Sequence, residues 1–400
     1  MEYMNAVAEL KPVGISSSMK IDLMDKILQQ DVGDEAMSNL KYWIWLSSMV
    51  NASPGKKYQL LQYFRDPALV WEAGEADLAA SGLCSKKLIT HLIDKTARKE
   101  TERAFESVKK CDADVITIYD RTYPELLKHI ADPPLILYCR GKPEPDETCM
   151  AVVGSRRATW YGLDMAKRLA GDLARHGVTV VSGMARGIDS QAHKGALEAG
   201  GRTIAVLGCG IDIAYPPENR GLMEEIIRHG AVISEYLPGT EPARYNFPAR
   251  NRIISGISLG VTIVEAGEKS GSLITAEYAL DQGRDVFAVP GNINSYNSAG
   301  TNRLIRDGAK IVTGVGDILD ELNIRHDSKN TYSSAKKLAV MKLNRDEKTI
   351  AQRLLNGPVH LDVICRDCGI SVQMASSILL MLELSGFVEQ LPGKYYRLVE

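Results

Sequence analysis

The sequence has no apolar run long enough to cross a membrane. A helix that spans a bilayer needs about 18 or more consecutive apolar residues, and the 400 residues contain no such run. The N-terminus also lacks the order of charged, apolar and small residues that marks a secretory signal. We therefore expect a cytoplasmic protein with no membrane partner.

Cysteine is sparse and irregularly placed. The seven cysteines are scattered along the chain, and an odd, scattered set argues against a disulfide framework. Cys365 and Cys368 form a CxxC pair, but no second CxxC and no HxxxH accompanies them. We therefore expect two incidental thiols rather than a redox pair or half of a zinc site, and we predict no metal site and no cofactor.

The chain also lacks a large charge of one sign and the common signatures of catalysis. Its formal net charge is −2, so any surface that attracts nucleic acid must be local. Neither GxxxxGK[ST] nor GxSxG occurs, and Gly208-Cys209-Gly210 lacks the third glycine of a dinucleotide fingerprint. The sequence therefore predicts a protein without catalytic residues.

Changes in composition divide the chain into five parts. These are a weakly patterned segment (1–38), a helical domain (39–112), an α/β domain (113–323), a basic flexible linker (324–343) and a winged-helix domain (344–400). Pro-Gly and Ser-Gly turns with a few lysines punctuate the helical domain. Such a domain either contacts a phosphate backbone through its turns or serves as an interaction or spacer module, and the scarcity of lysine favours the second role.

In the α/β domain, short apolar runs alternate with helical patterns. The runs at 203–207, 231–234, 261–264 and 286–289 are typical of buried strands. This order predicts a doubly wound, mostly parallel sheet. Ligands of such sheets bind beyond the carboxyl ends of the strands.

Two strand-to-helix turns in this domain are built to approach an anion. They read Gly154-Ser155-Arg156 and Ser182-Gly183-Met184-Ala185-Arg186-Gly187. Glycine backbones and free helix N-terminal N–H groups suit phosphate, and the two arginines add forked donors. The alternative is a pair of tight turns that serve only the backbone.

A third segment, 243–255, concentrates cations beside aromatic rings. Pro248 suits the start of a helix that would carry Arg250 and Asn251 in its first turn. A cation there opposes the helix dipole unless an anion binds between the charges. Tyr245 and Phe247 lie beside them, which is the composition for stacking a base while its phosphate is held.

The alternatives for this segment and for nearby acids are structural. Phe247 could belong to the core, with the arginines paired to Glu235 or Glu241. A fourth turn, Ser270-Gly271-Ser272, again offers donors at a helix start. General acid/base roles for Glu265 or Glu277, and for the pair Asp189 and His193, are the enzymatic alternative, and a structural Asp/His pair is favoured.

The C-terminal segment has the order of a winged helix. Three helical patterns precede a hairpin that turns at Pro392-Gly393-Lys394, and Ser371 is a plausible N-cap for the third helix. That helix carries no Arg or Lys where a DNA-reading helix needs them. Protein contact or an accessory role is therefore favoured over sequence-specific DNA binding.

Taken in order, the motifs resemble those of the DprA/Smf family of DNA-processing proteins from bacterial natural transformation. The matching stretches are Gly154-Ser155-Arg156, Ser182 to Asp189 with Ala192-His193, Phe247 to Ser255, and Glu265-Ala266 with Ser270 to Ala276. Upstream, Tyr123-Pro124, Asp132-Pro133-Pro134 and Tyr138 to Gly141 fit as well. Four motifs in the same order make the resemblance specific, and it covers residues 40–322 densely.

The resemblance implies an extended Rossmann-like domain between a SAM-like helical domain and a winged helix. It implies a homodimer that binds single-stranded DNA without sequence preference, protects incoming DNA and loads the recombinase RecA onto it. We predict a phosphate pocket from Gly154, Ser155, Arg156, Ser182, Gly183, Arg186, Gly187, Arg250, Asn251, Arg252, Gly271 and Ser272, with Arg244 as a further cation and Phe247 as a stacking ring. The competing hypothesis is a nucleotide-processing hydrolase on the same fold.

Overall fold

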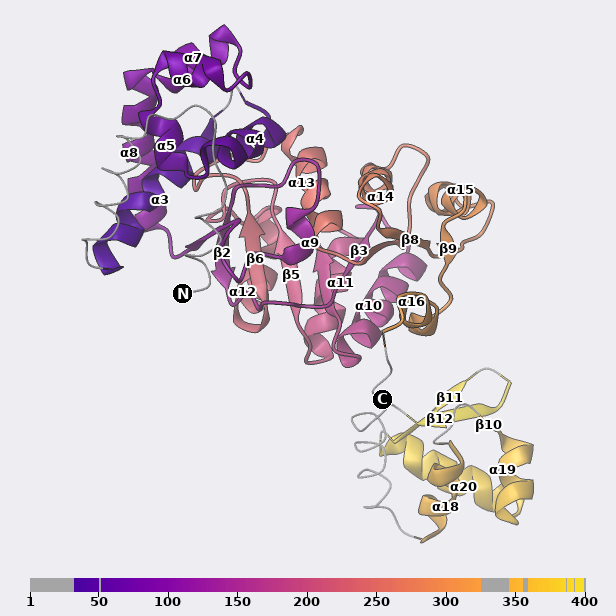
Figure 1. The fold of residues 1–400 in the computed structure, drawn as a ribbon. Coiled ribbons are helices and arrows are strands. Elements are labelled where there is room, and N and C mark those ends of the chain that lie inside the picture. The colour runs from indigo at the N-terminus through magenta and orange to yellow at the C-terminus, as the bar shows by residue number, and fades with distance from the viewer. Residues whose placement is uncertain are drawn as a thin grey trace. The chain divides into compact units, whose positions relative to one another are not determined.

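The computed structural model describes residues 32–49, 52–324, 345–354, 359–385, 387–391 and 393–398. These residues form two compact units, which divide between Arg325 and His326 (Figure 1). The segment before residue 32 and the expected linker from 325 onward lie outside the described residues.

The first unit begins with helices. They are α3 (Val32–Ser48), α4 (Pro54–Phe64), α5 (Pro67–Glu72), α6 (Glu75–Ala80), α7 (Lys86–Leu92) and α8 (Lys95–Lys110). Side chains cap several N-termini: Ser53 accepts from the N–H of Lys56, and Ser85 accepts from the N–H of Leu88. Helix α3 begins seven residues before the expected boundary at residue 39.

A sheet of nine strands follows, in the order β1-β2-β6-β5-β4-β3-β7-β8-β9. The strands are β1 (Asp114–Thr117), β2 (Ile136–Gly141), β3 (Cys149–Val153), β4 (Thr179–Ser182), β5 (Thr203–Val206), β6 (Ala231–Ser234), β7 (Gly260–Ile263), β8 (Asp285–Ala288) and β9 (Lys310–Ile311). The seven strands from β6 to β9 in this order pair in parallel, whereas β2 is antiparallel to β6 and β1 to β2. The predicted mostly parallel sheet is confirmed.

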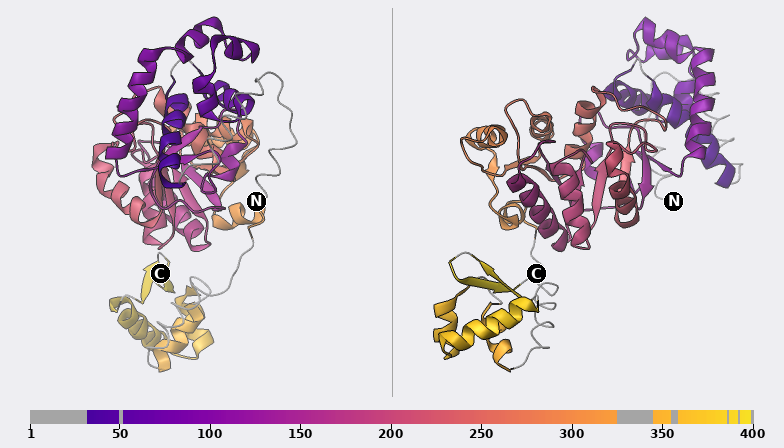
Figure 2. Two further views of the ribbon diagram at one scale, coloured as in Figure 1. Left: turned by 60° about the vertical axis from the view of Figure 1, so that its left-hand side comes forward. Right: turned by 180° about the vertical axis from the view of Figure 1, so that it is seen from behind.

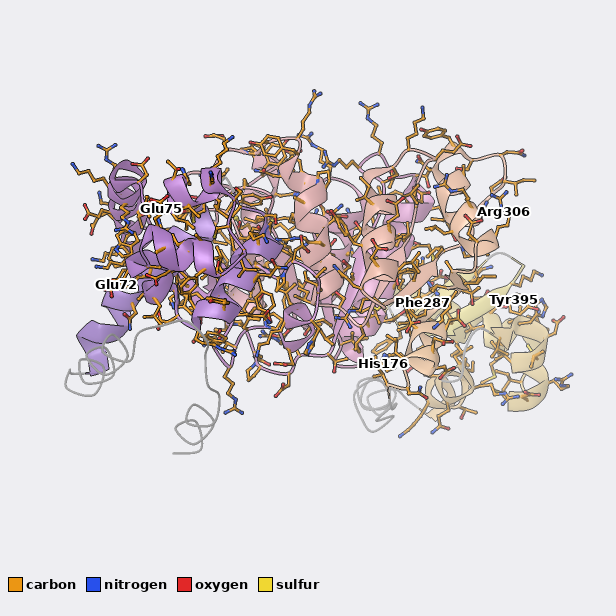
Figure 3. The ribbon with its side chains drawn as sticks, turned by 45° about the horizontal axis from the view of Figure 1, so that its top comes forward. Glu72, Glu75, His176, Phe287, Arg306 and Tyr395 are labelled. Carbon is orange, nitrogen blue, oxygen red and sulfur yellow. The ribbon has the colours of Figure 1, made fainter. Side chains whose placement is uncertain are left out.

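Helices cover both faces of the sheet, as Figure 2 shows from two sides. They are α9 (Glu125–Lys128), α10 (Trp160–Arg175), α11 (Ile188–Glu198), α12 (Arg220–His229), α13 (Asn246–Gly256), α14 (Gly271–Asp281), α15 (Ala299–Arg306) and α16 (Val315–Glu321). Successive residues of β3 face opposite ways: Val152 packs in the cluster that holds α10 and α11, and Val153 packs in the cluster that holds α13 and α14. Both faces are therefore apolar, as in other buried parallel sheets, and Phe287 on β8 is fully buried (Figure 3).

The strand order reverses at β3. The chain moves outward from β3 through β4 and β5 to β6, then returns to the other side of β3 to form β7, β8 and β9. The strands β3 and β7 are neighbours, and the chain leaves their carboxyl ends in opposite directions along the sheet. A doubly wound sheet opens a crevice at such a point.

The second unit is a small winged helix. It contains α18 (Arg345–Leu354), β10 (Val359–His360), α19 (Leu361–Cys368), α20 (Val372–Leu384), β11 (Val388–Leu391) and β12 (Tyr395–Leu398), and its sheet has the order β10-β12-β11. Ser371 caps α20 by accepting from the N–H of Met374 at 3.3 Å, as predicted. The short strand β10 was not predicted.

In the described ranges, no single helix is long and apolar enough to cross a bilayer; α19 and α20 pass that test only when joined across a bend of 111°.

Candidate nucleic-acid interface

A pocket of about 850 Å³ lies at the point where the strand order reverses. Residues after β3, β4 and β7 meet there with the start of α13 and of α14. Of the residues predicted from the sequence, the lining contains Gly154, Ser155, Arg156, Arg244, Phe247, Arg250, Asn251, Gly271 and Ser272. Tertiary structure thus brings all four predicted segments to one cavity, the second of them through Ala185.

The turn after β3 presents an exposed arginine over an aromatic ring. The guanidinium carbon of Arg156 lies 5.2 Å from the centroid of the Phe247 ring. Phe247 in turn stacks on Tyr215, with ring centroids 5.4 Å apart and ring planes at 27°. Phe247 is half-buried and lines the pocket, so the alternative of a core phenylalanine is wrong. The arrangement offers a cation and a ring face to one ligand.

A buried arginine holds the turn after β4 in place through hydrogen bonds to backbone carbonyls. Arg250 is 4% exposed, and it donates to the carbonyl of Gly183 at 2.9 Å and to the carbonyl of Val206. Burial lowers the pKa of Arg250 to about 10, which leaves it charged at neutral pH. Arg250 therefore places a fixed positive charge in the pocket wall while it holds the second turn in place.

Asp189 lies beside this arginine in the floor of the pocket. Its carboxylate accepts from the N–H groups of Gly183 at 3.2 Å and Ala185 at 3.4 Å. Burial raises the pKa of Asp189, and the charge of Arg250 opposes that rise. The carboxylate shapes the turn after β4 and partly balances Arg250.

Gly187 joins the first two turns. Its φ of 79° lies in the left-handed region, and a Cβ there would collide with the carbonyl oxygen of Ser155. The N–H of Ile188 donates to that same oxygen at 3.3 Å. Only glycine permits this close approach of the two turns.

The helix that carries Arg250 begins earlier than predicted. Helix α13 starts at Asn246, so Pro248 is its third residue, and Arg250 and Asn251 lie in its second turn. The predicted conflict with the helix dipole is therefore weaker than expected, because the dipole acts mainly in the first turn. Asn251 reaches the fourth turn instead, where it donates to the carbonyl of Gly271 at 3.4 Å.

Five predicted residues do not line the pocket: Ser182, Gly183, Arg186, Gly187 and Arg252. Ser182 is buried and donates to the carbonyl of Val152 at 2.7 Å. Arg186 is exposed and forms an ion pair with Glu218.

Arg252 points away from the pocket into a buried ion-pair network. It is 3% exposed and contacts Asp132 at 3.0 Å and Glu235 at 2.6 Å. The alternative that an arginine of this segment pairs with Glu235 is confirmed for Arg252, which therefore has a structural role here.

Lys57 of α4 joins the same network from the helical part of the unit. Burial lowers the pKa of Lys57 to about 8, although Glu235 acts to raise it. Its Nζ donates to the carbonyl of Ser47 at 2.5 Å. This lysine is therefore engaged in the interior and does not present its charge to a phosphate backbone.

The lining also contains residues that were not predicted, and four of these are cationic or aromatic: Arg157, Tyr215, Lys269 and Tyr296. Arg157 directly follows the predicted motif, so its sequence position carried a signal. Tyr215 and Tyr296 lie in long loops after β5 and β8, where no periodic pattern marks them.

The lining of the pocket is strongly cationic. It contains Arg156, Arg157, Arg244, Arg250 and Lys269, whereas Asp189 is its single acidic residue. The start of α14 lies in the same wall, where Ser270 caps the helix by accepting from the N–H of Ser272 at 3.4 Å. Cationic side chains and a helix N-terminus are the groups that suit an anion.

Glu265 and Asp189, two of the acids considered for catalysis, hold structural hydrogen bonds, whereas the third, Glu277, is exposed and outside the pocket lining. Glu265 is 2% exposed and accepts from the N–H of Thr159 at 2.8 Å and from its hydroxyl. The ring of His193 bonds the hydroxyl of Thr203 at 2.7 Å, while Asp189 binds backbone N–H groups. Among the described residues, no group of three or more His, Cys, Asp or Glu is placed to hold a metal ion.

The fold and the site together define a class: a doubly wound α/β protein with a cationic pocket at its switch point, followed by a winged helix. The chain belongs to the DprA/Smf family. The family model described as DNA recombination-mediator protein A matches residues 114–323, and the DprA winged helix domain matches residues 334–394. The resemblance predicted from the motifs is confirmed.

Proteins from several bacteria are similar to this chain. Protein Smf of Synechocystis sp. is 32% identical over 395 residues, which cover 90% of this chain and 99% of that protein. DNA processing protein DprA of Streptococcus pneumoniae is 45% identical over 206 residues, which cover 51% of this chain and 73% of that protein. The X-ray structure of DprA from Streptococcus pneumoniae superimposes with a TM-score of 0.61 and 35% identity, covering 70% of this chain and 97% of that one.

Proposed function

We propose that this protein binds single-stranded DNA without sequence preference and acts as a non-catalytic recombination mediator. The observation that carries the proposal is the pocket in which Arg156 lies over the ring of Phe247 and cations outnumber the single acid Asp189. A phosphodiester needs the cations, and an unpaired base needs the exposed ring. Membership of the DNA recombination-mediator family supports the same conclusion.

The pocket residues have different roles in binding the nucleotide. In our proposal, the exposed Arg156 contacts a phosphate from solution, and the buried Arg250 adds a fixed positive potential beneath it. The N–H of Ser155 donates to the carbonyl of Glu265, so the hydroxyl of Ser155 and the start of α14 complete the phosphate site in our proposal. Phe247 stacks one base, and stacking tolerates any base because every base has a π-face.

The size of the pocket fits this division. About 850 Å³ lies within the range of pockets that enclose a small molecule, so it holds one nucleotide rather than a duplex. A duplex keeps its bases inside the stack and cannot place one on Phe247. Preference for the single strand follows from that geometry.

A binding comparison tests the proposal. Labelled oligothymidylate of roughly 20 nucleotides should bind better than a duplex of equal length, and less tightly as salt rises. Arg156→Ala should weaken binding roughly tenfold to a hundredfold, the range for losing a charge-assisted hydrogen bond. The matched control is Arg306→Ala on α15, because Arg306 is exposed but outside the pocket lining. A preference for duplex, or an Arg156→Ala variant that binds like wild type, contradicts the proposal.

We further infer that the protein is a homodimer that protects incoming DNA and loads RecA onto it. The resemblance of the motifs supports these roles, and a strand held by its backbone and one stacked base leaves its remaining bases available for a recombinase. Light scattering should give the mass of a dimer. RecA filaments should form faster on coated single strands when the protein is present, and Arg156→Ala should remove most of that acceleration.

A further inference from the structure

The pocket accommodates one nucleotide, so a longer strand must continue across the surface beside it. This inference rests on the proposed binding of single-stranded DNA. The question it addresses is which residues receive the neighbouring base. Of the exposed rings in the described part of the chain, Tyr296 lines the pocket and Trp160 lies three residues after the lining residue Arg157.

Trp160 is 84% exposed, more than any other tryptophan among the described residues. It is the first residue of α10, directly after Thr159, whose N–H and hydroxyl both donate to Glu265 at the end of β7. The backbone at Trp160 is therefore fixed beside the strand end at which the pocket opens. The indole itself buries little surface, so it contributes little to folding.

Tyr296 is 71% exposed and lines the pocket. A Cβ at Gly267 would stand 2.5 Å from Cε1 of Tyr296, so the ring rests against the bare backbone of that glycine. Its neighbour Asn297 donates to the carbonyl of Arg157 at 2.8 Å. This bond joins the loop of Tyr296 to the turn that also leads to Trp160.

A second bond joins the same two segments. The hydroxyl of Tyr161 donates to the carbonyl of Pro290 at 3.2 Å, at the start of the loop that leads to Tyr296. Arg157, whose exposed side chain lines the pocket, lies three residues before Trp160, and its carbonyl accepts from Asn297, next to Tyr296. Rings alternating with arginines are the composition of a surface that stacks bases and holds the phosphates between them.

We propose that Trp160 and Tyr296 form an outer stacking platform for the nucleotide next to the one in the pocket, with Arg157 on the phosphate between them. An isolated exposed tryptophan needs no explanation. Two such rings, tied by hydrogen bonds to the turns of one cationic pocket, form a continuation of that pocket. The platform extends the strand's path over the segments that follow β3 and β8.

Tryptophan fluorescence tests the platform directly. Oligothymidylate of roughly 20 nucleotides should quench the emission of Trp160 on binding, because a stacked base contacts the indole. Thymidine 5′-monophosphate, which fills only the inner pocket, should bind without this quenching. Trp43→Phe is the control for the spectroscopy: Trp43 packs edge-on against Tyr119, away from the pocket lining, and the variant should keep the quenching.

Two substitutions at Trp160 separate stacking from apolar contact. Trp160→Phe should retain affinity for the oligonucleotide while losing the quenching signal. Trp160→Leu keeps an apolar side chain without a ring and should weaken oligonucleotide binding roughly tenfold, with affinity for the mononucleotide unchanged. Oligonucleotide binding without quenching, or a Trp160→Leu variant that binds like wild type, overturns the platform. Failure of the proposed function gives a different result: the wild-type protein then binds no oligonucleotide at all, which also rules out the platform.

Discussion

The cavities at the two ends of the sheet have different charged residues in their linings. At the carboxyl end, the pocket of about 850 Å³ is lined by five cationic residues and one acid. At the amino end, a cavity of about 290 Å³ near the starts of β3, β5 and β6 is lined by Glu125, Glu144, Asp146 and Glu147, with no Lys or Arg in its lining. Glu144 and Glu147 pair with Arg202, and Glu125 pairs with Lys128, so the acidic lining is largely balanced. The net charge of −2 therefore conceals one strong local field, at the carboxyl end.

The difference follows from the polarity of a parallel sheet. The helices that follow parallel strands begin at the carboxyl end, so their N-terminal N–H groups and positive dipole ends gather there. Arginines in the turns add to that field, and an anion satisfies both. Acidic residues occur at the opposite end, where helices terminate. Nucleic acid should therefore bind to one end only.

The largest expected effect is the loss of stability when the buried Arg250 of the cationic pocket is replaced. Arg250→Ala removes the donor to the carbonyls of Gly183 and Val206 and leaves Asp189 buried without its compensating charge. We expect the free energy of unfolding to fall by about 3–5 kcal/mol, as when one partner of a buried charged network is removed. Urea denaturation measures it.

Arg156→Ala serves as the comparison for that measurement. Arg156 is exposed, so its removal should change stability by less than about 0.5 kcal/mol while it weakens DNA binding. If Arg250→Ala unfolds at the same urea concentration as wild type, then Arg250 does not have the structural role that distinguishes it from the DNA-contacting Arg156.

The next effect is a loss of stability in acid. Burial lowers the pKa of His193 to about 3, whereas an unfolded histidine titrates near 6.5. The unfolded chain then binds the extra proton, so the stability that neutral His193 contributes is present above about pH 6.5 and is lost as the pH falls toward 3. At pH 5 the loss should be about 2 kcal/mol.

Urea denaturation at pH 7 and pH 5 checks this prediction. His193→Gln should reduce the difference between the two pH values, since glutamine can still bond the hydroxyl of Thr203 and does not titrate. The matched control is His176→Gln, at the exposed end of α10, which should keep the wild-type difference. An undiminished difference in His193→Gln would show that other groups cause the acid sensitivity.

The smallest expected effect is at the acidic end. Asp146→Asn removes one charge from the amino-end cavity, and asparagine accepts the positive φ of 62° found there. Affinity for single-stranded DNA should change less than twofold, roughly the limit for a distant screened charge. The matched change at the other end, Arg157→Gln, should weaken binding roughly fivefold or more. Equal effects of the two substitutions would break the contrast between the ends of the sheet.

Much of the fold follows from local pattern. Apolar runs such as 261–264 and 286–289 are strands within one residue, because a strand buried on both faces reads as a continuous apolar run. Strand β9, with two residues, carries too little pattern to be recognised. Helix α13 begins two residues before Pro248, because proline is also tolerated within the first turn, where its missing N–H has no partner to lose.

The amino-acid sequence by itself determined the family, the alternation of strands and helices, and the turns from which the pocket is built. It did not determine which arginines face the ligand. Arg250 and Arg252 are two residues apart on one helix, yet one lines the pocket and the other pairs with Asp132 and Glu235 on the far side. Arg156 and Arg186 occupy similar turns, yet only Arg156 reaches the pocket. The packing of α13 and the reversal of strand order at β3 decided those roles, because a charge acts through what surrounds it in space rather than through its neighbours in the chain.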